Sequence, residues 1–175
     1  LQSTKPIRIM IVIETLLKEI FSQLPQVPDS SDKLFNPKFN WGSQDALNLF
    51  IATTKEKYPL IWLVESEETA KLYPENVERT VRLILAKNSN HITNTNPIIW
   101  ETEYTKTLNP LLEYVLRALE SSGATNIVKG TYTANRISNY SEETKKNKTV
   151  DVWNVIVLEA RVRFTNNCIN QIKFT

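Results

Sequence analysis

Apolar residues recur at spacings of three and four near the beginning of the chain, which is the repeat of an amphipathic helix. The repeat runs from Ile9 to Leu24, and charged residues occupy the other faces. Pro25 and Pro28 follow it, and proline cannot continue a helix because it lacks an N–H group and clashes with the preceding turn. The pattern therefore predicts a first helix that ends before Pro25.

The next segment, Gln26 to Gly42, has no helical repeat and contains several Pro, Asp and Ser residues. A connection of this length inside a compact domain is usually functional or mobile. Its aromatic residues, Phe35, Phe39 and Trp41, make it too apolar for a free tether. We therefore expect a long Pro-rich loop that docks in part on another surface.

A short helix and two strands are predicted after this loop. Ser43 is suited to cap the helix, whose apolar residues lie on one side. The runs Leu60–Val64 and Val77–Ala86 have the length and composition of strands. The polar segment between them, Glu65 to Asn76, is expected to be a loop.

A third helix has the clearest apolar stripe in the chain, from Tyr104 to Leu119. Proline is tolerated in a first helical turn, so Pro110 places the start of the regular helix near Asn109. Gly123 lies where a left-handed C-terminal cap is expected.

The C-terminal third is predicted to consist of strands. The first strand is Ile127–Ile137, and a protruding hairpin tip, Ser138–Lys148, follows it. The longest alternation of the chain then runs from Val150 to Phe164, which is about fifteen residues and well beyond the usual strand length. A final short strand is expected at Ile169–Phe174.

The outer face of the long strand is half apolar, because it carries Trp153, Val155 and Val157. We expect a helix or another subunit to cover it. Taken together, the elements predict an α+β fold with an antiparallel or mixed β-sheet and helices packed on one face. The chain is expected to form a single domain over residues 1–175.

Composition limits the chemistry open to this chain. It has 175 residues with 41% hydrophobic and 23% charged, which suits one packed domain, and its net charge of +2 is far below the excess of a dedicated nucleic-acid binder. Cys168 and His91 are its only Cys and His. The chain alone therefore builds no disulfide, no zinc site of Cys and His, and no His-paired catalytic triad. We expect no metal, no cofactor and no catalytic residue, with Cys168 a buried, inert thiol.

The most apolar early run, Ile7 to Ile13, is too short to span a bilayer and contains Arg8. It also lacks a small-residue cleavage site, so we expect neither a signal peptide nor contact with a membrane.

Carboxylates provide one alternative reading. Asp151 and Glu159 lie on one strand face, and with Glu65 and Lys129 they resemble the active-site residues of a metal-dependent nuclease. However, eight positions on an extended strand separate Asp151 from Glu159 by roughly 26 Å, so the two cannot share one ion. Cross-strand ion pairs are the simpler explanation of the charges on this strand.

A second alternative is an accessory nucleic-acid binder that uses the lysines of the hairpin tip, Lys145, Lys146 and Lys148. Glu142 and Glu143 precede them and reduce the local charge. Phosphate affinity grows with the number of unopposed cations, so a solvated loop is the simpler interpretation.

The remaining features concern surfaces. A docked loop, a half-apolar strand face and a protruding hairpin provide more adhesive area than a monomer needs, which favours an oligomeric building block. The expected interface residues are Phe35, Phe39, Trp41, Lys145, Lys146, Lys148, Trp153, Val155 and Val157.

This layout resembles the tail-terminator, tail-completion and neck (head–tail connector) proteins of tailed bacteriophages. The resemblance is one of element order and covers most of the chain. Its features are the N-terminal amphipathic helix, Tyr58-Pro59 before the strand Leu60–Val64, the strand Val77–Ala86, the helix Leu108–Leu119, and the strand Val150–Phe164 with Asp151 and Trp153 near its start.

The resemblance implies a homohexameric ring that caps the tail tube or joins it to the head connector, without catalytic residues. We therefore expect a non-enzymatic virion structural protein that is assembled in the host cytoplasm. Its expected partners are copies of itself and neighbouring connector and tail proteins, with at most a passing contact with DNA. The nuclease and the accessory nucleic-acid binder remain the alternatives.

Overall fold

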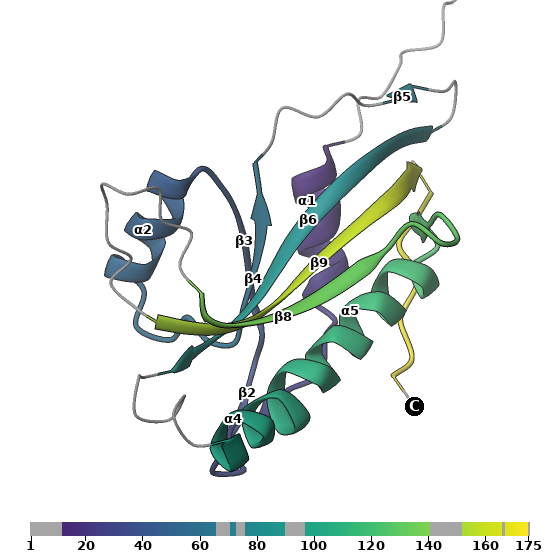
Figure 1. Ribbon diagram of the computed structural model, residues 1–175. Helices are drawn as coiled ribbons and strands as arrows, with labels where there is room; N and C mark the ends of the chain where they lie inside the picture. Colours follow the sequence, from purple (N-terminus) through teal and green to yellow (C-terminus); the bar gives the residue numbers. More distant parts are fainter. Residues whose placement is uncertain are drawn as a thin grey trace, which may run out of the picture.

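The computed structural model describes residues 12–65, 71–72, 76–89, 97–140, 152–165 and 167–174. A mixed sheet forms its centre (Figure 1). Its strands lie in the order β3 (Lys38–Gly42), β4 (Leu60–Val64), β6 (Asn76–Ser89), β9 (Val152–Thr165) and β7 (Thr125–Ile127), while β5 (Lys71–Leu72) pairs with β6 and β8 (Thr133–Tyr140) pairs with β9. Only the pair β3–β4 is parallel among these pairings. The predicted α+β class with a mixed sheet is thus confirmed.

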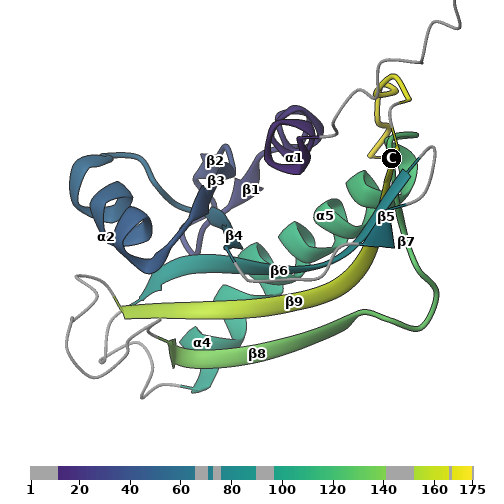
Figure 2. The same cartoon turned by 90° about the horizontal axis from the view of Figure 1, so that it is seen from above.

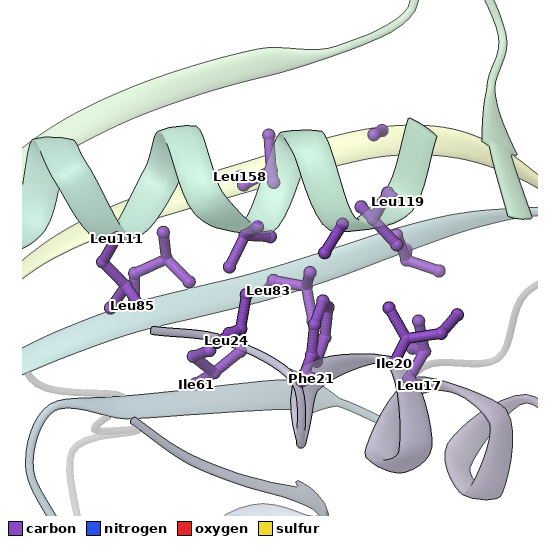
Figure 3. Close-up of a cluster of buried hydrophobic side chains, with 14 of the residues drawn as sticks. Leu17, Ile20, Phe21, Leu24, Ile61, Leu83, Leu85, Leu111, Leu119 and Leu158 are labelled. Atoms are coloured by element: carbon purple, nitrogen blue, oxygen red, sulfur yellow. The ribbon is translucent and has the colours of Figure 1, made fainter. Parts of the chain in front are cut away.

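Two helices cover one face of the sheet, α1 (Ile13–Phe21) and α5 (Asn109–Ser121). Figure 3 shows Leu17 and Ile20 of α1 extending toward Leu119 of α5, with Leu83 of β6 between the two helices. These four side chains have no exposed surface. Burial of a leucine or isoleucine side chain contributes about 1.5–3 kcal/mol, so this layer is the main source of stability.

The helix α5 follows a π-helical segment, η1 (Tyr104–Leu108), and a short helix, α4 (Pro97–Glu103). Its predicted start at Asn109 and its left-handed cap at Gly123, with φ +76°, are both confirmed. The sequence pattern predicts one apolar stripe from Tyr104 to Leu119. In the structure this stripe begins in the π-helical segment η1 and continues in the α-helix α5.

The helix α2 (Gln44–Thr53) lies on the other face of the sheet, at the end away from β7 (Figure 2). The Ser43 hydroxyl accepts a hydrogen bond from the Ala46 N–H at 3.3 Å, which confirms the predicted cap. The expectation that helices pack on one face therefore holds for α1 and α5 and not for α2.

This helix also explains the apolar outer face of β9. Trp153 and Val155 are 0% exposed and Val157 is 4% exposed, and all three pack in one cluster with Leu47 and Ile51 of α2. A helix of the same chain is thus the cover. The interpretation of Trp153, Val155 and Val157 as interface residues is wrong, because they belong to the core.

The predicted loop Gln26 to Gly42 contains more regular structure than expected. Its first part forms a small hairpin of β1 (Val27–Pro28) and β2 (Leu34–Phe35). Its last part is β3, which pairs along its whole length with β4. The expected docking thus includes backbone pairing, which makes β3 an integral part of the sheet.

Two further expectations on strands are corrected. The predicted strand Ile127–Ile137 is interrupted by a turn in which Gly130 has φ +72°, so it forms the two strands β7 and β8. The segment Ile169–Phe174 is not a strand, although the Asn170 N–H donates to Ser122 O at 2.8 Å and holds it against the end of α5. Residues 138–140 of the predicted hairpin tip belong to β8, and the rest of the tip, residues 141–148, lies outside the described residues.

Candidate functional site

The sheet has two edges of different character, β3 on one side and β8 on the other (Figure 1). Among the strands that the structure describes, β3 pairs with β4 alone and β8 pairs with β9 alone. The outer backbone groups of such edge strands are a template on which another strand can add. These two edges are therefore the candidate functional surfaces.

Backbone hydrogen bonds show which groups β3 directs outward. The Lys38 N–H donates to Pro59 O at 2.9 Å, and Gly42 O accepts from the Glu65 N–H at 3.3 Å. Because alternate residues of a strand face opposite sides, the backbone groups of Phe39 and Trp41 point away from β4. The Trp41 N–H donates to the Asn40 side chain at 2.9 Å, which an added strand would have to displace.

The side chains of this edge form an aromatic cluster at the surface. Phe39 is half-buried and its ring centroid lies 5.1 Å from that of Phe21 in α1. The ring centroid of Trp41 lies 5.9 Å from that of Phe39, and 37% of the Trp41 surface is exposed. Phe35 on β2 is half-buried, with the Lys33 ammonium 4.9 Å from its ring centroid. The structure thus places two of the predicted residues, Phe39 and Trp41, on this edge. The third, Phe35, lies on β2, which pairs with β1 and not with the large sheet.

The other edge, β8, is exposed along its length. Every residue from Thr133 to Ser138 is exposed, and Ile137 has 39% of its surface accessible. Neither Lys nor Pro occurs in this strand, and these are the residues that commonly protect an edge from further pairing. A register shift between Ile137 and Tyr140 is its one irregularity.

The direction of the β8 backbone groups follows from its neighbour. The Thr165 N–H of β9 donates to Ala124 O, and Arg161 O accepts from the Val128 N–H, both at 2.9 Å. Odd-numbered residues of β9 therefore direct their backbone groups toward β7 and β8. Thr133, Asn135 and Ile137 lie opposite odd-numbered β9 residues, so their own backbone groups point back to β9.

The intervening residues Ala134 and Arg136 consequently direct their N–H groups away from the sheet. The Arg136 side chain does not protect this edge, because its guanidinium lies 5.4 Å from the ring centroid of Tyr104 and donates to Asn109 Oδ1 at 2.9 Å. The guanidinium group of Arg136 thus lies against η1 and the start of α5 of the same chain.

Tyr104 attaches β8 to the helical layer. Its side chain is 1% exposed, and its hydroxyl lies 3.0 Å from Ile137 O and 3.1 Å from Val155 O, the carbonyl oxygens of a cross-strand pair. Desolvation outweighs these hydrogen bonds and raises the pKa of Tyr104 to about 12. The hydroxyl therefore remains a donor at neutral pH.

The charged face of β6 and β9 is organised by ion pairs. Arg82 Nε lies 3.3 Å from Glu159 Oε1, while Glu78 pairs with Arg161 at 3.6 Å and with Arg163 at 3.3 Å. Each of these pairs joins β6 to β9, as expected of cross-strand ion pairs. Glu159 thus has a structural partner.

Of the other members of the nuclease alternative, Glu65 is separated from Glu159 by a strand of the sheet. Glu65 follows β4, which β6 separates from β9, and Lys129 lies in the turn between β7 and β8. Asp151 lies outside the described residues. No group of three or more His, Cys, Asp or Glu side chains suited to a metal ion occurs in the part of the chain that the structure describes.

The remaining predicted residues have different outcomes. Cys168 is exposed, so the expectation of a buried thiol is wrong. His91 and the hairpin lysines Lys145, Lys146 and Lys148 lie outside the described residues. Over the described ranges, no helix has the length and apolar character needed to cross a membrane.

Comparison with known proteins adds no family assignment. No protein-family model matches the chain, and no curated protein matches it in sequence.

The sequence does not show which strands lie at the two edges of the sheet. The β3 edge was visible only as three aromatic residues in a polar segment, and β8 was merged with β7. The signal for the break was Gly130, which follows Lys129 in the middle of the predicted strand.

Proposed function

We propose that this protein is a non-enzymatic structural subunit of the head–tail junction of a tailed bacteriophage, and that it acts in the virion as a closed homo-oligomeric ring. The resemblance in element order supports the virion assignment and implies six subunits. The pair of unlike open edges supports the ring.

The physical reason is one of symmetry. The edge β3 carries Phe39 and Trp41 on a short strand parallel to its neighbour, whereas β8 is a longer antiparallel strand with few apolar side chains. Contact between two different surfaces of identical subunits is heterologous. Such contacts form a closed ring when a whole number of the rotations that relate neighbouring subunits makes up 360°. Pairing of β8 with the β3 edge of the next subunit is such a contact, and it continues one sheet around the ring.

The mass and shape of the purified protein test this proposal. Native mass spectrometry and negative-stain electron microscopy should show one closed multimer, formed by the protein alone or with connector and tail components. A monomer at every concentration that binds none of these components would contradict the proposal. Incubation with DNA and Mg²⁺ or Mn²⁺ separates it from the nuclease alternative, since a structural subunit requires no turnover.

A further inference from the structure

A cavity of about 140 Å³ lies between the β1–β2 hairpin, η1 and the end of β6. Its apolar wall consists of Val27, Pro28, Phe35, Tyr58 and Pro59. A cavity of about 150 Å³ with apolar walls is large enough for a benzene molecule. The space therefore suits a group of one six-membered ring.

One polar side chain of the wall, Lys87, has unused hydrogen-bonding capacity. Its side chain is 12% exposed, and its nearest acidic partner is Glu103, with Nζ 3.6 Å from Oε1. Within the described part of the chain its buried Nζ makes no hydrogen bond. An ammonium group has three donors, and burial of a charge without hydrogen bonds is costly. An acceptor atom in the cavity would relieve that cost.

The surrounding charges select a neutral acceptor. Glu103, which is 5% exposed, also accepts a hydrogen bond from the Asn154 side chain. Asp29 lies at the cavity wall. Desolvation raises the pKa of its carboxyl group. Hydrogen bonds from Ser31 and Lys33 and the charge of Lys87 lower this pKa by more, so the pKa is lowered overall. Two carboxylates thus lie near one ammonium, which disfavours an anionic ligand.

We infer that this cavity is a binding site for a small neutral carbonyl compound with a single ring, whose oxygen accepts a hydrogen bond from Lys87 Nζ while its ring lies against Phe35, Tyr58 and Pro59. Asn88 is exposed and lines the same cavity, so it marks the side open to the ligand. None of the described residues that line this cavity belongs to β3 or β8, so the inference does not depend on ring formation.

Benzamide is the test ligand, because it combines a phenyl ring with a neutral carbonyl of suitable size. Benzoate has the same ring with an anionic acceptor, and toluene has the ring without an acceptor. In NMR titrations of the full chain, benzamide should shift the signals of Val27, Lys87 and Thr107 at millimolar concentration, and should bind more tightly than benzoate or toluene. Absence of benzamide binding, shifts confined to another region, or preference for benzoate would overturn the inference.

A pair of variants separates the hydrogen bond from the shape of the cavity. The double variant Lys87→Met with Glu103→Gln removes both charges of the buried pair, and should weaken benzamide binding at least about tenfold while toluene binding is unchanged. Val27→Phe fills the cavity and should abolish binding of both ligands. Unchanged benzamide affinity in the double variant would overturn the role of Lys87. If either variant fails to fold, the wild-type titration with the three ligands decides the inference.

Discussion

The hydroxyl group of Tyr104 lies 3.0 Å from the carbonyl oxygen of Ile137, and this contact joins the π-helical segment η1 to the open edge strand β8. The same hydroxyl lies 3.1 Å from Val155 O on β9. A buried side chain on a helix therefore stabilises the position of a strand that has only one neighbour in the described sheet.

Removal of this hydroxyl should loosen the edge. Tyr104→Phe keeps the ring in the core and deletes the hydrogen bond, so we expect the free energy of unfolding to fall by about 1–2 kcal/mol. The substitution should accelerate hydrogen exchange of the β8 amides more than that of the β6 amides. Tyr132→Phe is the matched control, because Tyr132 is 49% exposed, and it should leave stability within about 0.5 kcal/mol of the wild type. Equal loss in both variants would show that Tyr104 does not anchor β8.

Stability should also depend on Tyr104 at alkaline pH. Burial raises the pKa of this group in the folded protein from 10.0 to about 12, so the unfolded chain loses its proton first. The stabilisation is then complete below about pH 10 and is lost as pH rises toward 12, with a total of about 2–3 kcal/mol. Urea denaturation of the wild type and Tyr104→Phe through this range should show the steeper decline in the wild type. Parallel curves would contradict the assignment.

The buried pair of Lys87 and Glu103 should show strong coupling. Lys87→Met alone leaves the Glu103 carboxylate buried without its cation, and we expect a loss of about 3–5 kcal/mol. Addition of Glu103→Gln should restore most of this loss, because the amide oxygen can still accept from Asn154. A double-mutant cycle by urea denaturation measures the coupling. Additive effects of the two substitutions would show that the side chains do not interact.

Two glycines provide a test of how the C-terminal segment is held. Gly123 and Gly130 both have positive φ angles, +76° and +72°. A Cβ atom at Gly123 would lie 2.4 Å from Asn170 Nδ2, whereas a Cβ at Gly130 would meet nothing within 4 Å. Gly130→Ala should therefore cost only the backbone strain, about 1 kcal/mol, and Gly123→Ala should cost somewhat more, about 1–2 kcal/mol, because the Asn170 side chain must also move. Thermal unfolding and limited proteolysis measure both effects, and equal costs would exclude the contact with Asn170.

Much of the fold could be predicted because the relevant signals are local. The strand Leu60–Val64 is a continuous β-forming run, and Ser43 and Gly123 have the cap chemistry that their positions require. The length of β9 was visible because its alternation is long. Each of these elements is determined mainly by its own residues.

The elements that were missed depend on distant partners. The strand β3 has five residues, and it is a strand because it pairs with β4, about twenty positions away. The apolar face of β9 was recognised, but strand periodicity does not show whether α2 or a second subunit covers it. The C-terminal residues 169–174 have suitable composition but pair with no strand in the described sheet. Instead, the Asn170 N–H donates to Ser122 O at the end of α5 and the Ile172 N–H donates to Gln23 Oε1. The two edge strands of the sheet follow from the strand order, which depends on pairing between distant segments.

The most direct test of ring formation through β8 is sedimentation velocity on the wild type and two variants of Ala134. The N–H of this residue points away from β9, so Ala134→Pro removes an outward donor and leaves the β8–β9 hydrogen bonds in place. Ala134→Ser keeps the donor and is the control. We expect the wild type and Ala134→Ser to sediment as one multimer, and Ala134→Pro to sediment as a monomer with an unchanged far-UV circular dichroism spectrum. Assembly of Ala134→Pro indistinguishable from that of the wild type would contradict pairing through β8.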